Sequence, residues 1–139
     1  MAIKSQPSLQ VLINSVIELY SNGQIQEALD SVEALIKDYP NEAILYNICG
    51  ACYAGLGQLD TAVKRYEKSL AIKPDYAEAH YNLGFSLHRL GQLDAAVRCY
   101  KKVVAIKPDY AKAHNNKILS VITFSLADRY QMQSIHLKP

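Results

Sequence analysis

The sequence predicts an all-α protein, a right-handed superhelical solenoid built from antiparallel helix hairpins. Two observations predict this fold class. First, the chain of 139 residues repeats with a period of 34, and residues 43–76 match residues 77–110 at 17 of 34 positions. Second, the apolar residues of each block recur at helical spacing on both sides of a turn glycine, and a proline follows the second helix. Hairpins of this length stack and bury their apolar faces against one another.

The elements follow from the repeat register. In the block at 77–110, Leu83 and Leu87 mark a first helix, Gly91 stops it with a positive φ, and Pro108 ends the second helix. A fourth block starts well but has lost its turn glycine. We therefore expect one solenoid domain over 9–130, preceded by an N-terminal extension at 1–8 and followed by a C-terminal tail at 131–139. The domain consists of the repeats 9–42, 43–76 and 77–110 and a partial repeat or capping helix at 111–130.

In this register the chain resembles the tetratricopeptide repeat (TPR) family. We number positions 1–34 within each block, and the family's pattern is matched in the third block by Leu83, Gly84, Gly91, Ala96, Tyr100 and Pro108. The second block matches it with Gly50, Tyr53, Gly57, Ala62, Tyr66 and Pro74. Val16 replaces the glycine of position 8 in the first block, so its two helices should lie less close together. The chain is also similar to the repeat arms of O-linked N-acetylglucosamine transferases and of other bacterial TPR proteins.

Composition narrows the functional classes. The net charge of +2 lacks the basic excess of a general nucleic-acid binder. No segment approaches the roughly 20 apolar residues of a membrane span, and no signal peptide is recognisable. We expect a cytoplasmic protein that binds neither nucleic acid nor membrane.

The third block carries an unusual stripe on its first helix. Glu78, Asn82, Phe85 and Arg89 recur at spacings of 4, 3 and 4 on the side opposite the core leucines, with Tyr81 at the flank. The resemblance to the family implies that the first helices line a concave groove that binds an extended peptide or a partner helix. We therefore expect this stripe to belong to a peptide-binding groove.

Asparagines recur along the same predicted surface. Asn14, Asn82 and Asn116 share repeat position 6, Asn47 is next to it in the second block, and Lys112 is four residues before Asn116. An amide can donate to and accept from a peptide backbone whatever its side chains are. The row resembles the asparagine ladder of the transferase arms named above. Asparagine is also a tolerated polar residue on an exposed helix, and the sequence leaves both interpretations open.

Other sites are disfavoured. The two-carboxylate clamp of chaperone-binding TPR domains is matched only by Asn82 and Lys112. Cys49 and Cys52 have the spacing of a redox or metal pair, but they lie inside a predicted helix at core positions, with no second pair to complete a zinc site. No catalytic constellation or phosphate loop is present. We expect a non-enzymatic protein without cofactor or metal.

The last segment is rich in apolar residues for a terminal helix. We interpret four of them as oligomer contacts, namely Leu119, Ile122, Phe124 and Leu126. Self-association is therefore one alternative for the function, as a homo-oligomeric scaffold assembled through its termini. The other is that the chain forms the regulatory or substrate-presenting arm of a larger transferase, such as a glycosyltransferase or a sulfotransferase.

Overall fold

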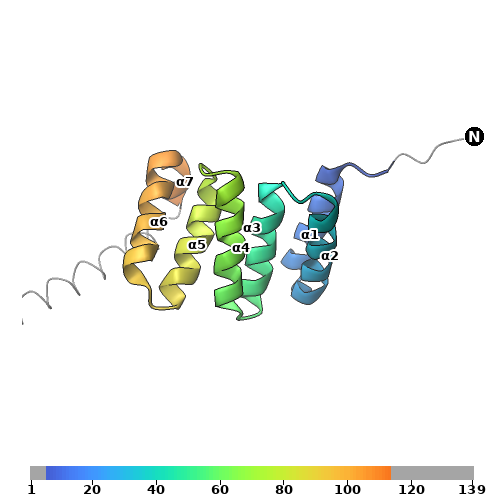
Figure 1. Cartoon of the computed structure of the whole chain (residues 1–139), viewed down its shortest axis with the longest axis horizontal. Coiled ribbons are helices and arrows are strands. Elements are labelled where there is room, and N and C mark those ends of the chain that lie inside the picture. The colour runs from blue at the N-terminus through green and yellow to red at the C-terminus, as the bar shows by residue number, and fades with distance from the viewer. Residues whose placement is uncertain (1–5, 114–139) are drawn as a thin grey trace, which may run out of the picture. The chain divides into compact units, whose positions relative to one another are not determined.

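The computed structural model describes residues 6–113, and of residues 111–113 only the backbone. These residues form α-helices and no strand, as the sequence predicts. The described residues form two compact units that meet in sequence between Ile72 and Lys73. The first contains α1 (Leu9–Ser21), α2 (Ile25–Asp38), α3 (Ala43–Gly55) and α4 (Leu59–Ile72), and the second contains α5 (Ala77–Arg89), α6 (Leu93–Ile106) and α7 (Pro108–Ala113) (Figure 1).

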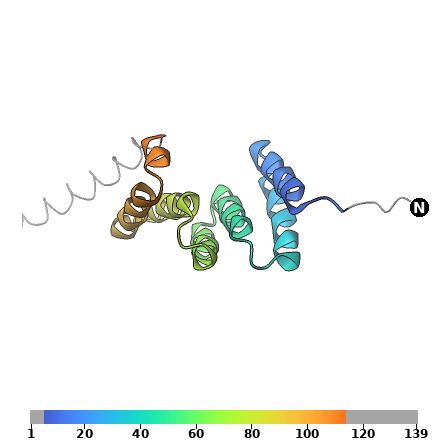
Figure 2. The ribbon, with the colours of Figure 1, turned by 90° about the horizontal axis from the view of Figure 1, so that it is seen from above.

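The helices pair as hairpins through the predicted turn glycines. Gly23, Gly57 and Gly91 have φ near +80°, a conformation that side chains disfavour. In the first turn the amide of Gln24 donates to the carbonyl of Leu19 at 2.9 Å, and the other two turns repeat this bond. This is a Schellman stop, which satisfies the free carbonyls at a helix end. Figures 1 and 2 show the result: α1 lies beside α2, α3 beside α4, and α5 beside α6.

A glycine at position 8 lets two of these hairpins close tightly on a tyrosine at position 24. A methyl group added to Gly50 would be 2.6 Å from the ring of Tyr66, and one added to Gly84 would be 2.9 Å from the ring of Tyr100. Both tyrosines are buried. The ring therefore fills the space that the missing side chain leaves.

The first hairpin fills the same space differently. Val16 takes the place of the glycine and Val32 the place of the tyrosine, and both are buried. As predicted from Val16, α1 and α2 approach less closely than α3 and α4 do. Two mid-sized side chains thus replace one large and one absent side chain.

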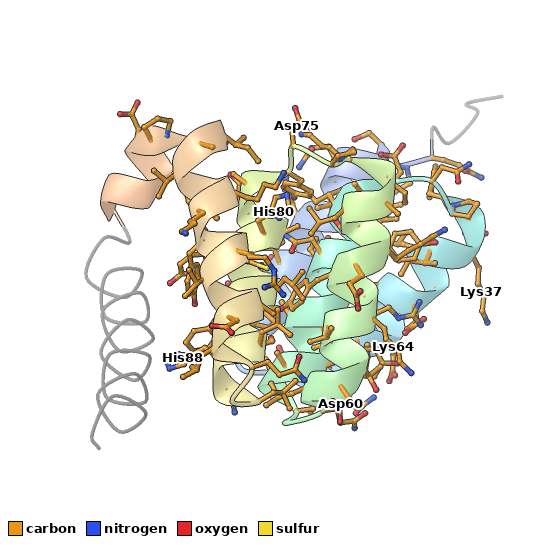
Figure 3. All side chains as sticks on the ribbon, turned by 60° about the vertical axis from the view of Figure 1, so that its left-hand side comes forward. Lys37, Asp60, Lys64, Asp75, His80 and His88 are labelled. Atoms are coloured by element: carbon orange, nitrogen blue, oxygen red, sulfur yellow. The ribbon has the colours of Figure 1, made fainter. Side chains whose placement is uncertain are left out.

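Repeat position 4 holds the connection that precedes the first helix of the second and third blocks. Tyr46 donates its hydroxyl to the carbonyl of Pro40 at 2.8 Å, and the Nε2 of His80 lies 2.8 Å from the carbonyl of Pro74. Figure 3 shows Asp75 in the connection before α5 and His80 farther along that helix. Tyr46 and His80 thus each hydrogen-bond the carbonyl of the proline six residues earlier.

The end of the third block agrees with the prediction that the second helix does not continue past Pro108. Helix α6 ends at Ile106, and the proline then opens α7, a short helix that the repeat pattern does not predict there. Proline suits the first turn of a helix because its missing N–H would have no helical partner there. Of the helix expected at 111–130, the structure describes only residues 111–113.

No helix within residues 6–113 has the length and apolarity needed to cross a membrane.

We predict that Gly50→Ala lowers the free energy of unfolding by about 1–2 kcal/mol, because overpacking against Tyr66 outweighs the better helix propensity of alanine. Gly55→Ala is the control, since its new methyl group meets Ile25 at an ordinary 3.4 Å. Urea unfolding should show Gly55→Ala at least as stable as the parent chain. Replacing both Gly50 and Tyr66 with valine should be less harmful than Gly50→Val alone. Equal stability of the two alanine variants would contradict this packing argument.

A second prediction concerns a buried hydroxyl. The Oη of Tyr100 has no hydrogen-bond partner among the described residues, and burial raises the pKa of this phenol. Tyr100→Phe should leave the melting temperature unchanged or raise it, because the unpaired hydroxyl is costly to bury. Tyr46→Phe is the counterpart and should lose about 1 kcal/mol with its bond to Pro40. A clear loss of stability in Tyr100→Phe would contradict the conclusion that this hydroxyl is buried without a hydrogen-bond partner.

Candidate functional site

The predicted stripe exists on α5 of the second unit. We call Glu78, Asn82, Phe85 and Arg89 the α5 stripe. Arg89 is exposed and the other three are half-buried, whereas Leu83 on the same helix is buried. Each residue of the stripe therefore keeps part of its surface exposed along the helix.

Phe85 and Arg89 interact within the stripe. The guanidinium carbon of Arg89 lies 6.0 Å from the centre of the Phe85 ring, at the limit of a cation–π contact. The two residues are one helical turn apart, so the helix itself sets this geometry. Together they present a cation beside an aromatic surface.

At the other end of the stripe, Glu78 forms an ion pair with a lysine. The Nζ of Lys107 on the C-terminal side of α6 donates to Oε1 of Glu78 at 3.0 Å. Partial burial opposes ionisation of Glu78, but the hydrogen bond and charge of Lys107 hold the pKa of this carboxyl below its usual value. The negative charge of the stripe thus has a cation beside it.

Two predicted groove residues are buried instead. Asn47 and Tyr81 are each only 8% exposed. They share repeat position 5, where the first block has the buried Ile13. The ring of Tyr81 packs 5.7 Å from the centres of both Tyr100 and Tyr110. The expectation that these two side chains line an open face is therefore wrong, since position 5 faces inward in all three described blocks.

Position 6 points outward, but not every block has asparagine there. Asn14 is exposed on α1 and its Oδ1 accepts a hydrogen bond from Gln10 at 2.9 Å. Ile48 occupies this position in the second block, half-buried against the core. Asn82 is the equivalent on α5. Among the described residues, the proposed asparagine row consists of Asn14 and Asn82.

The structure does not describe the side chains of the other predicted groove and oligomer-contact residues. Lys112 belongs to α7, of which only the backbone is described at that residue. The others lie outside the described residues, and they are Asn116, Leu119, Ile122, Phe124 and Leu126.

The first unit contains a polar cluster that sequence reasoning missed. The Oε1 of Glu33 on α2 accepts hydrogen bonds from Tyr53 Oη at 3.0 Å, from Arg65 Nη2 at 3.1 Å and from Cys49 Sγ at 3.3 Å. One carboxylate therefore links the first hairpin to both helices of the second. The repeat gave no signal for this cluster, because position 25 is lysine in the third block, at Lys101.

The cysteines are packed in the core, as expected from their positions. Cys49 and Cys52 are fully buried. Burial, with the hydrogen bond to Glu33, raises the pKa of Cys49, and burial raises that of Cys52 to about 11. Thiols protonated at neutral pH are poor nucleophiles and metal ligands. Within residues 6–113 no cluster of histidine, cysteine or acidic residues could hold a metal ion.

Comparison with protein families identifies the repeat. One family model, described as TPR repeat, matches residues 53–91, and another, described as tetratricopeptide repeat, matches residues 77–110. The peroxisomal targeting signal receptor of Candida glabrata is 29% identical over 77 residues, which are 55% of this chain and 13% of the receptor. The receptor of Candida albicans is 36% identical over 64 residues, 46% of this chain and 11% of the receptor. The chain thus matches only a small part of these relatives.

Solved structures show the same fold. The first TPR domain of Spaghetti (RPAP3), bound to the HSP90 peptide SRMEEVD, superposes with a TM-score of 0.77 over 85% of this chain and 92% of its own, at 21% identity. The Yersinia enterocolitica type III secretion chaperone SycD, in complex with a peptide of the translocator YopD, gives a TM-score of 0.81 over 90% of this chain and 97% of its own, at 17% identity. The predicted helical-repeat fold is confirmed.

A third prediction tests the Glu33 cluster. Glu33→Ala should lower the free energy of unfolding by about 1 kcal/mol, a modest value because the ion pair with Arg65 is one-third exposed. Glu67→Ala is a matched control, since Glu67 occupies the same repeat position on α4 and is exposed. Urea unfolding should separate the two variants. If Glu67→Ala costs as much as Glu33→Ala, the cluster does not stabilise the first unit.

Proposed function

Residues 53–110 of this chain belong to the tetratricopeptide repeat family, and we propose that the chain is a non-catalytic interaction module that holds an extended peptide along α5. Repeats of this family mediate protein–protein interaction. The observation that carries the proposal is the α5 stripe, in which an amide, an aromatic ring and a cation lie in line on the accessible side of one helix.

Each side chain of the stripe suits a different part of a peptide. The amide of Asn82 can donate to a peptide carbonyl and accept from a peptide N–H at once, which requires no particular side chain on the ligand. Phe85 offers apolar area at low entropic cost. Arg89 supplies a charge. Such a combination of backbone hydrogen bonds with selective contacts is how extended peptides are recognised.

The structural neighbours support this class of ligand. Two of them were solved with bound peptides, an HSP90 peptide in one and a YopD peptide in the other. Their structural similarity supports the scaffold and the ligand class. Because their sequence identity to this chain is low, it does not support these particular peptides as ligands.

The experiment is selection of peptides on the purified chain from a phage-displayed random library, followed by fluorescence anisotropy with the selected sequences. Asn82→Ala should weaken binding about tenfold, the effect of one or two lost hydrogen bonds in a partly desolvated site. Asn41→Ala, which removes an exposed amide from the connection between α2 and α3, is the control and should bind like the parent chain.

Circular dichroism must show that both variants keep the parent's helicity and melting temperature. Equal affinity of Asn82→Ala and the parent for every selected peptide would exclude a role for this amide. Recovery of no specific peptide would overturn the proposed function.

A further inference from the structure

Resting on the proposed function, we propose that the peptide bound along α5 carries an acidic side chain that pairs with Arg89 and an apolar side chain, two residues away, that packs on Phe85. The inference concerns the ligand's sequence. It follows from the distribution of charge along the stripe and from the spacing of its side chains.

The charge distribution leaves Arg89 as the cation that a ligand can neutralise. Glu78, the acidic residue of the stripe, is bound to Lys107 at 3.0 Å. Arg89 is exposed and makes no ion pair with any residue in 6–113, and its guanidinium lies beside the ring of Phe85. A guanidinium beside an aromatic ring is weakly hydrated and keeps its planar fork available for a carboxylate. The complementary ligand group is therefore an anion.

The spacing defines where that anion lies in the peptide. Asn82 and Phe85 are separated by about 4.5 Å along the helix axis, and Phe85 and Arg89 by about 6 Å, at a rise of 1.5 Å per residue. An extended peptide advances about 3.4 Å per residue, and its side chains alternate between two sides. If the backbone of residue i bonds to Asn82, residues i+1 and i+3 face the helix near Phe85 and Arg89. The predicted motif is thus apolar, any residue, acidic, in either chain direction.

The repeat register assigns this selectivity to one block. The residues equivalent to Arg89 are Ser21 in the first block and Gly55 in the second, which carry no charge. The equivalents of Phe85 are Ile17 and Ala51. The first two blocks therefore offer an apolar contact at the position of Phe85 but no cation at the position of Arg89. Of these three blocks, only the third has a cation there, on α5.

The test uses an array of ten-residue peptides acetylated at the N-terminus and amidated at the C-terminus, so that a side chain supplies any carboxylate. The array contains every pairing of an apolar and an acidic, neutral or basic residue at separations of one to four. A second copy with free C-termini distinguishes recognition of a side-chain carboxylate from recognition of a terminal one. The parent chain is compared with Arg89→Gln, Arg89→Glu and the control Arg98→Gln, which removes another exposed arginine, from α6.

We expect the parent chain to prefer blocked peptides with an apolar and an acidic residue two apart. Arg89→Gln should lose about tenfold in affinity for these peptides, Arg98→Gln should bind like the parent, and Arg89→Glu should shift the preference to lysine or arginine at the same place. Circular dichroism of all variants controls for folding.

Three outcomes would overturn the inference and leave the proposed function standing: binding of blocked peptides without acidic preference, an equal effect of Arg89→Gln and Arg98→Gln, or binding restricted to peptides with a free C-terminus. Failure of the parent chain to bind any peptide in either array would instead overturn the proposed function.

Discussion

The close packing of a glycine against a tyrosine is the contact on which the repeat hairpins depend. Gly50 with Tyr66 and Gly84 with Tyr100 hold paired helices so near that a single methyl group would collide with a ring. This contact sets how α3 and α5 are rotated against their partner helices, and the buried Val16 and Val32 take its place in the first hairpin. Position 5 is turned inward and position 6 outward. The α5 stripe is a consequence of that rotation, and so is any binding along it.

Much of the fold could be predicted because its determinants are local. The turn glycines require a positive φ that the sequence alone indicates, and all three adopt it. The substitution of Val16 for glycine correctly predicted a looser first hairpin, since side-chain volume at one position controls helix separation. Pro108 was less predictable. The same residue can follow one helix or begin the next, and the local sequence does not decide between these roles.

The site was predicted only in part because polarity is a poor guide to exposure at a single position. The amide of Asn47 resembles the outward asparagines, but Asn47 lies one residue from their position, and one residue along a helix is a rotation of about 100°. The sequence predicts Tyr81 at the flank of the stripe, but its ring packs against the rings of Tyr100 and Tyr110. The Glu33 cluster was missed for a different reason. The cluster joins Glu33 to Cys49, Tyr53 and Arg65 in the next repeat. The third block does not repeat this set of donors and acceptor, so the repeat pattern gives no sign of it.

The central claim is that a peptide binds along the outward side of α5. Its most direct test is an NMR titration of the uniformly ¹⁵N-labelled chain with a blocked peptide selected by binding. We predict that the backbone amide signals of Asn82, Phe85 and Arg89 and the side-chain N–H signals of Asn82 and Arg89 shift together and saturate with a single affinity. The backbone amide signals of Arg98 and Lys102 on the exposed side of α6 should stay in place. Shifts centred on α6, with the α5 signals unchanged, would contradict the account.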